Sequence, residues 1–296
     1  MSTIDRRSLY QWCRVPAADL ARHPSRKVPF RLVADSLAMG ACMARELVEA
    51  IEDANSRGSE LRAIIPCGPS SWYAPFTDMV NSRGVSLARF VVFHMDECLD
   101  WQGRELPLAH PYSFRGFMER HFYGPVRPEL SVPEKNRYWL VPSTVERVRE
   151  AIAAGPIHLT YGGWGQDGHI AYNQARRSPY SAVSLEELEQ SSIRIQENNT
   201  DTVIALAQRT FGAAWQFVPP MSVTLGLKEC LSARKVRLFS DTGAWKQTAL
   251  RVALFSPPTA EYPLTLLQKH PDALLTATVE TASHPISLHP EWDLGL

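Results

Sequence analysis

A glycine-rich stretch that holds an acid and a histidine is the strongest chemical signal in this sequence. Residues 161–173 read YGGWGQDGHIAYN and follow the apolar run IHLT. Asp167 and His169 are two positions apart, and a carboxylate near an imidazole can fix its tautomer and raise its basicity, as general acid/base catalysis requires. The glycines, Gly163 among them, permit tight turns that bring backbone N–H groups close to a phosphate or oxyanion. A structural histidine in a glycine-rich turn is the alternative interpretation.

Two adjacent carboxylates form a second candidate. Asp96 and Glu97 directly follow the apolar run RFVVFHM. Neighbouring side chains of an extended chain point to opposite sides, so only one of the two can readily face a cleft. The dipeptide alone is more typical of a helix or turn cap. Assigning Asp96 to catalysis therefore needs further support.

Candidate anion-binding residues follow two other apolar runs. The segment CGPSS places Cys67, Gly68 and Ser70 after LRAIIP, and Lys246 lies in DTGAWKQTAL, where a helix is expected to begin. Small residues and hydroxyls at a helix N-terminus present free N–H groups to a phosphate, and a lysine adds a charge. Arg209 is a further cation whose orientation the pattern leaves open. Each of these signals is weak alone.

Short apolar runs that end in polar loops predict the sheet that positions these residues. They occupy 61–66, 89–95, 137–143, 157–165, 222–226, 235–241 and 274–279, with helical stretches between most of them. Parallel strands need crossover connections, which are usually helices, so the pattern predicts a parallel, doubly wound α/β sheet. Ligands bind at strand ends in such sheets, which is where the candidate residues lie.

The domain organisation is simple. Residues 1–30 show little periodicity and are predicted to be an extension packed on the surface, followed by one domain over 31–296. Residues 33–55 carry apolar residues at helical spacing and predict one long helix. Residues 175–199 are expected to form a long loop with one short helix, and a loop of that length is often a lid.

The composition argues against several classes of protein. Lys plus Arg equals Asp plus Glu at 31 each, so no overall charge favours nucleic acid or an anionic membrane. The five cysteines are scattered without a C-x-x-C pair, which argues against a disulfide framework and a zinc site. No segment is typical of a signal peptide or a membrane span. We therefore expect a cytoplasmic protein that binds a small molecule; the sequence leaves homo-oligomer formation open.

The order and spacing of these motifs resemble the glucosamine-6-phosphate deaminases. The shared elements are MDE at 95–97, HPYSF at 110–114, GGWGQDGHIAYN at 162–173, SVTLG at 222–226 and the Lys246 segment. The resemblance covers roughly residues 33–292. It implies an open, three-layer, mostly parallel α/β fold with helices on both faces, related to the 6-phosphogluconolactonases, and a reaction that needs no metal or organic cofactor.

The resemblance also implies roles for individual residues. Asp96 matches the acid/base that moves a proton between C1 and C2 of the opened sugar, and Asp167 with His169 matches the pair that serves ring opening. Lys246 matches a phosphate ligand, and the CGPS loop falls where the family has its phosphate loop. Arg209 matches the family's phosphate arginine only if one residue is inserted nearby.

Gln174 departs from the family pattern, which has a Glu directly after the Asn of DGHIAFNEP. Gln cannot carry the charge that would stabilise a protonated imidazole. Either His169 works with Asp167 alone, or a carboxylate from 186–189 takes the place of the Glu, or the substrate differs. The expected function is that of a divergent aldose-ketose isomerase/deaminase acting on glucosamine 6-phosphate or a related sugar phosphate. The alternatives are a sugar-phosphate sensor without turnover and a 6-phosphogluconolactonase-type hydrolase.

Overall fold

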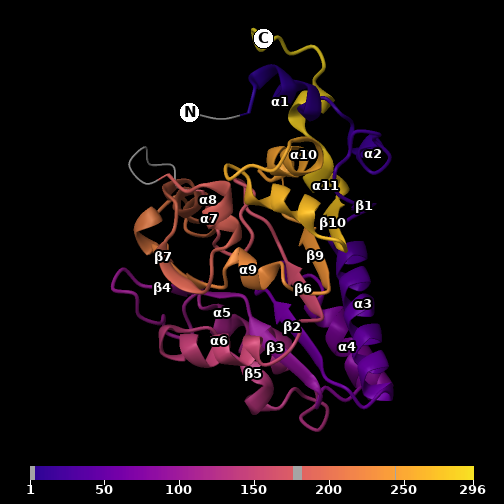
Figure 1. The fold of residues 1–296 in the computed structure, drawn as a ribbon, viewed down its shortest axis with the longest axis vertical. Helices are drawn as coiled ribbons and strands as arrows, with labels where there is room; N and C mark the ends of the chain where they lie inside the picture. Colours follow the sequence, from indigo (N-terminus) through magenta and orange to yellow (C-terminus); the bar gives the residue numbers. More distant parts are fainter. Residues whose placement is uncertain (1–3, 176–181, 244) are drawn as a thin grey trace.

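A parallel sheet forms the centre of the protein (Figure 1). The computed structural model describes residues 4–175, 182–243 and 245–296. All pairings within this sheet are parallel. Its strands are, in order across the sheet, β1 (Phe30–Val33), β10 (Ala273–Thr278), β9 (Lys235–Ser240), β6 (Leu159–Gly162), β2 (Leu61–Ile65), β3 (Phe90–His94) and β5 (Arg137–Tyr138).

Helices cover both faces of the sheet, because successive side chains of a strand point to opposite faces. In β2, Ala63 and Ile65 belong to one buried cluster, together with apolar residues of α3 (Ser36–Ser56) and α4 (Tyr73–Arg83). Ile64, between them, belongs to the other cluster, which includes residues of α6 (Val145–Ala153) and α10 (Gln247–Phe255). The prediction of a three-layer, mostly parallel, doubly wound α/β fold is confirmed.

The remaining helices are short, apart from α8 beside the site. They are α1 (Arg6–Cys13), α2 (Ala17–Leu20), α5 (Phe114–Met118), which continues into a π-helical turn at Glu119–Tyr123, α7 (Leu185–Glu189), α8 (Thr200–Thr210), α9 (Leu227–Cys230), α11 (Val279–Ala282) and α12 (Pro285–Leu288). Turns of 3-10 helix occur at Glu134–Asn136, Pro142–Thr144, Trp215–Phe217 and Pro263–Lys269. Within the described ranges, no helix combines the length and apolarity needed to cross a membrane.

A second, antiparallel sheet corrects one sequence prediction. It has the order β4 (Asp96–Leu99), β8 (Met221–Thr224) and β7 (Arg194–Glu197), with Asp96 paired to Thr224. The assignment of 222–226 to the parallel sheet is therefore wrong. A short apolar run predicts a buried strand but carries no information about the direction of its partners.

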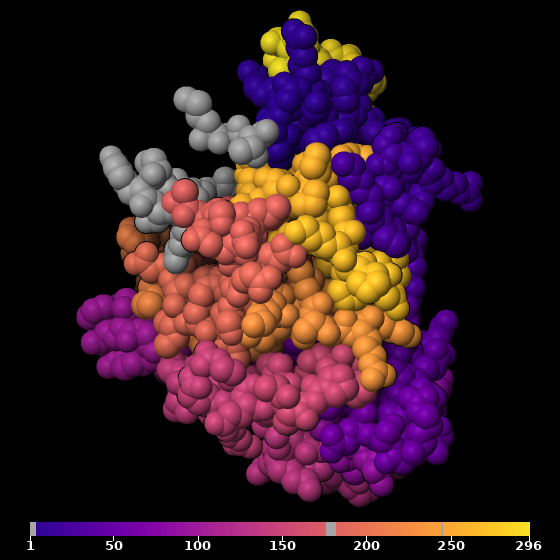
Figure 2. All heavy atoms as spheres, in the orientation of Figure 1, coloured from indigo at the N-terminus to yellow at the C-terminus, as the bar shows by residue number. Residues whose placement is uncertain are grey.

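Helix α1 and the C-terminal segment lie together at one end of the molecule (Figure 1). Helix α1 packs against α10 and α12, and Figure 2 shows the N-terminal residues in indigo beside the C-terminal segment in yellow. Residues of the predicted extension form α1 and α2, which the sequence pattern did not predict. Each of these helices ends in a buried residue, Cys13 and Leu20. The segment predicted to form a lid contains α7 and β7, while its residues 176–181 lie outside the described chain.

Candidate active site

A cleft of about 610 Å³ is lined by the loops that follow β9, β6, β2 and β3, which are neighbours in the parallel sheet. Parallel strands end at a common edge, so residues far apart in the sequence meet there. Most of the predicted site residues line this cleft: Cys67, Gly68, Ser70, Asp96, Gly163, His169, Arg209 and Lys246. Asp167 and Gln174 are buried and are hydrogen-bonded to each other next to His169.

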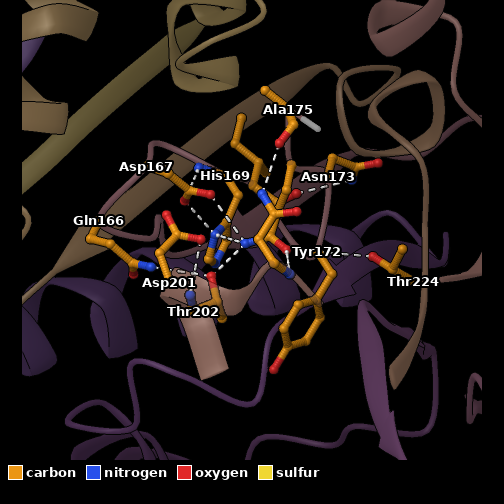
Figure 3. Close-up of polar contacts among 12 residues, drawn as sticks. Gln166, Asp167, His169, Tyr172, Asn173, Ala175, Asp201, Thr202 and Thr224 are labelled. Carbon is orange, nitrogen blue, oxygen red and sulfur yellow. Dashed lines mark hydrogen bonds and ion pairs between the residues drawn. The ribbon is translucent and has the colours of Figure 1, made fainter. Parts of the chain in front are cut away.

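The Asp167–His169 pair is held by a short contact and by the glycines around it. Asp167 is 3% exposed, and its Oδ1 lies 2.6 Å from His169 Nδ1 (Figure 3). A Cβ atom at Gly165 would lie 2.1 Å from the His169 ring, so only glycine leaves room for the imidazole. Gly168 has a φ of 72°, which an L side chain rarely adopts. The loop therefore needs glycine at these two positions to place the histidine.

Gln174 is fixed by hydrogen bonds that also orient His169. Its Oε1 accepts from the backbone N–H of Asn199 at 3.0 Å, so its Nε2 is the donor, to Asp167 Oδ2 at 3.1 Å and Thr202 Oγ1 at 2.5 Å. Gln174 Nε2 lies 3.1 Å from His169 Nδ1 but is a donor and cannot accept a proton, so the acceptor of the Nδ1 proton is Asp167 Oδ1 at 2.6 Å. His169 Nε2 then carries the free lone pair and can act as the base.

The glutamates of α7 point to other partners or to solvent in this structure, and Glu186 is exposed. Glu187 Oε2 accepts from the backbone N–H of Ser184 and caps its own helix. Glu189 pairs with Lys269 at 2.5 Å. The partners that do hold Gln174 come from α8 and the residue before it, Asn199 and Thr202, and the sequence analysis missed both.

Asp96 faces the cleft, and Glu97 points away from it. Asp96 is the first residue of β4, directly beyond the end of β3. Burial, with a contribution from the charge of Glu97, raises the pKa of Asp96 to about 8. A carboxyl group with this pKa exchanges protons readily near neutral pH. Glu97, which is 5% exposed, accepts backbone N–H groups of α5 instead.

Another part of the cleft holds two cations, Arg209 and Lys246, that both lie near the indole of Trp245. Arg209 is in the last turn of α8, and Lys246 directly precedes α10. The Trp245 ring centroid lies 5.9 Å from Arg209 Cζ and 6.0 Å from Lys246 Nζ. Burial and the nearby Arg209 lower the pKa of Lys246 to about 8, while Asp241 acts in the opposite direction. An anion bound here would relieve the repulsion between the two cations.

Hydroxyl groups that line the same cleft add donors that the sequence analysis did not identify. Ser71, Ser240 and Thr242 line the cleft, and their side-chain oxygens are buried without a hydrogen-bond partner in the described chain. A buried polar group without a partner is costly unless a ligand or water satisfies it. Together with the CGPS loop, these groups suit the oxygens of a phosphate. Among the described residues, no three His, Cys, Asp or Glu side chains converge as metal ligands.

Curated relatives of this chain share one name. The chain is 32% identical over 247 residues to the glucosamine-6-phosphate deaminase of Cronobacter sakazakii, covering 80% of this chain and 85% of that protein. It is 31% identical over 261 residues to the enzyme of the same name from Pectobacterium carotovorum subsp. carotovorum, covering 84% and 89%. The chain belongs to the glucosamine-6-phosphate deaminase family. No family model matches the sequence.

Solved structures support the family fold. A monomeric glucosamine-6-phosphate deaminase superposes with a TM-score of 0.71 at 18% identity, covering 86% of this chain and 98% of that one. A 6-phosphogluconolactonase from Shewanella baltica gives a TM-score of 0.58 at 15% identity, covering 84% and 97%. The deaminase family and the lactonases therefore share this architecture, and the residues of the cleft must distinguish their reactions.

Proposed function

We propose that this protein is an aldose-ketose isomerase/deaminase that converts glucosamine 6-phosphate and water to fructose 6-phosphate and ammonia. One observation carries the proposal: a single cleft brings together Asp96, the Asp167–His169 pair and the cations Arg209 and Lys246. The names of the curated relatives support the same reaction. A cytoplasmic location is part of this proposal and is supported by five free cysteines.

The phosphate binds at the two cations. Their positive charges and the unpartnered hydroxyls of Ser71, Ser240 and Thr242 match a dianion with several acceptor oxygens. The charges beside Lys246 are Arg209 and Asp241, whereas the charge beside Asp96 is Glu97. The phosphate and the reacting carbons therefore occupy different parts of the cleft.

Ring opening falls to His169. With its Nδ1 proton held by Asp167, its Nε2 can take the proton of the C1 hydroxyl and return it to the ring oxygen. Gln174 supplies no charge to this step, but its amide keeps Asp167 in place through the 3.1 Å hydrogen bond. Asp167 is then the carboxylate that is hydrogen-bonded to the imidazolium.

Proton transfer between C2 and C1 falls to Asp96. In its ionised form it removes the C2 proton of the opened sugar, which leaves an enolamine because C2 bears the amino group, and in its protonated form it delivers that proton to C1. Both forms are populated near its pKa of about 8, which a proton shuttle requires. Protonation at C1 leaves an iminium at C2; water adds to C2, and ammonia then leaves to give the ketose.

Product analysis tests the proposal. We expect the purified protein to release ammonia and fructose 6-phosphate from glucosamine 6-phosphate, and Asp96→Asn to lower kcat by about 1,000-fold. Hydrolysis of 6-phosphogluconolactone in place of these products would instead assign the lactonase reaction. Tight binding of glucosamine 6-phosphate without product over a long incubation would assign a sensor.

Gln174→Glu tests the departure from the family pattern. The new carboxylate would face Asp167 Oδ2 at about the 3.1 Å that the amide now spans, and it would lose the donors to Asp167 and Thr202. We therefore expect a kcat on glucosamine 6-phosphate lowered by about tenfold. A raised kcat would show that the missing charge, and not the placement of Asp167, limits turnover.

A further inference from the structure

We propose that Glu97 is a positioning residue of this active site: its carboxylate anchors one wall of the cleft, and its negative charge favours the protonated form of Asp96. The inference rests on the proposed function, because it assigns a second acidic residue to the same proton transfer. Glu97 is 5% exposed and forms no ion pair with a Lys or Arg of the described chain. A buried carboxylate without such a pair needs other partners.

Backbone N–H groups are those partners. Glu97 Oε1 accepts from Phe114 N at 2.7 Å and from Cys98 N at 3.0 Å, and Oε2 accepts from Arg115 N at 2.7 Å. Phe114 and Arg115 are the first residues of α5, where N–H groups have no partner within the helix. The carboxylate therefore joins the start of α5 to β4, the strand that begins with Asp96.

The start of α5 belongs to the wall of the cleft. Tyr112 and Phe114 line the cleft, and the Tyr112 hydroxyl donates to a backbone carbonyl of α8 at 3.1 Å and lies 2.6 Å from Thr210 Oγ1. Thr210 follows Arg209 in the same helical turn. Loosening the anchor would therefore shift this wall relative to Asp96 and weaken substrate binding.

The charge of Glu97 acts on Asp96. Burial raises the pKa of Glu97 to about 7, while its three N–H donors favour the ionised form and the exposed Glu105 disfavours it. The Arg115 guanidinium pairs with Glu119 at 2.9 Å and not with Glu97. His94, which lines the same space as the two carboxyls, is neutral near pH 7 because burial lowers its pKa well below its usual value. Four further groups are neutral because burial raises the pKa of each well above its usual value: Cys67, Cys98, Tyr172 and Cys230.

Two substitutions separate the anchor from the charge. Glu97→Gln removes the charge and keeps one acceptor oxygen, so we expect the acidic limb of the kcat profile to move to lower pH by about 1, because Asp96 releases its proton more easily. Glu97→Asp keeps the charge and shortens the side chain that anchors α5. We therefore expect the acidic limb of its kcat profile to lie at the same pH as in the wild type, and its KM to rise about fivefold. Glu60→Gln removes an exposed carboxylate that is not among the charges shifting the pKa of either carboxyl, and is expected to change neither quantity.

A readout without turnover keeps this inference separate from the proposed function. NMR of protein labelled with carbon-13 aspartate measures the pH midpoint at which the carboxyl carbon of Asp96 titrates. The signal of Asp96 is identified as the one that is lost in Asp96→Asn. If Glu97→Gln lowers this midpoint but the wild type forms no fructose 6-phosphate, the proposed function fails and the role of Glu97 stands. If the wild type turns over and Glu97→Gln leaves both midpoint and limb unchanged, the role of Glu97 is overturned. If Glu97→Gln does not fold, an unchanged KM in Glu97→Asp overturns the anchor, and a raised KM supports it.

Discussion

The two functional parts of the cleft are held in different ways. The Asp167–His169 pair sits in a loop where hydrogen bonds hold Asp167, His169 Nδ1 and Gln174, and where glycine is required for the ring to fit. Arg209 lies in α8 and Lys246 directly before α10, and neither makes a side-chain hydrogen bond to another described residue; their shared contact is the face of Trp245. The chemistry is preorganised, whereas the cations depend on the ligand for their partners.

This difference separates catalysis from binding. A preorganised pair loses turnover when its geometry changes by a fraction of an ångström, while cations that await an anion mainly set affinity. Substitutions in the loop are expected to lower kcat, and substitutions around Trp245 are expected to raise KM.

Among the substitutions that compare these two regions, Gly165→Ala has the largest expected effect. Its Cβ would lie 2.1 Å from the His169 ring, so the imidazole must move and kcat should fall by about 100-fold. Steady-state kinetics on glucosamine 6-phosphate measures this. Gly155→Ala is the control, because a Cβ there would meet nothing closer than 3.6 Å. Equal losses in the two variants would mean that the loop is less tightly determined than the structure indicates.

Lys246→Met comes next. Loss of the ammonium should raise KM by about tenfold with little change in kcat, since a charge-assisted contact to phosphate is removed. Burial lowers the pKa of Lys246 to about 8, so the wild-type lysine loses its charge as the pH rises through 8, and its KM should rise there. The KM of the variant should lack this rise. Lys228→Met, at an exposed position, is the control; a pH-dependent KM in Lys246→Met would contradict the assignment.

Trp245→Leu has the smallest expected effect. Removing the indole takes away a weak cation–π contact from each cation, so KM should rise by about threefold and kcat should stay near that of the wild type. Trp215→Leu removes an exposed tryptophan elsewhere and serves as the control. A fall in kcat alone would place Trp245 with the catalytic loop and would remove the distinction between the two regions.

The sequence predicted the fold class and the loops that meet at the cleft, because buried parallel strands produce continuous apolar runs that stop at polar residues. It did not predict β4, whose residues DECL include two carboxylates and do not resemble a strand. Strand β7, the other antiparallel partner of β8, has the polar sequence RIQE and was missed for the same reason. Strand pairing depends on which segments meet, and a single run does not contain that information.

The candidate site was predictable where partners are close in the sequence. Asp167 and His169 are two residues apart, whereas Asn199 and Thr202 reach Gln174 from more than twenty residues away. The contact of Trp245 with the two cations was not predictable, because an aromatic residue next to a lysine is most often part of a core. Whether each of these residues takes the role assigned to it stays a prediction for the experiments above.

Helix α8 has a consequence for which sugars can react. Its first turn carries Thr202, which holds Gln174, and its last turn carries Arg209. Seven residues at about 1.5 Å each separate the two by roughly 10 Å along the axis. The helix therefore sets the distance between the group that holds the ring-opening pair and the group that binds phosphate. A sugar phosphate with a shorter carbon chain would reach only one of them, so the length of α8 selects substrate length independently of any contact to the amino group.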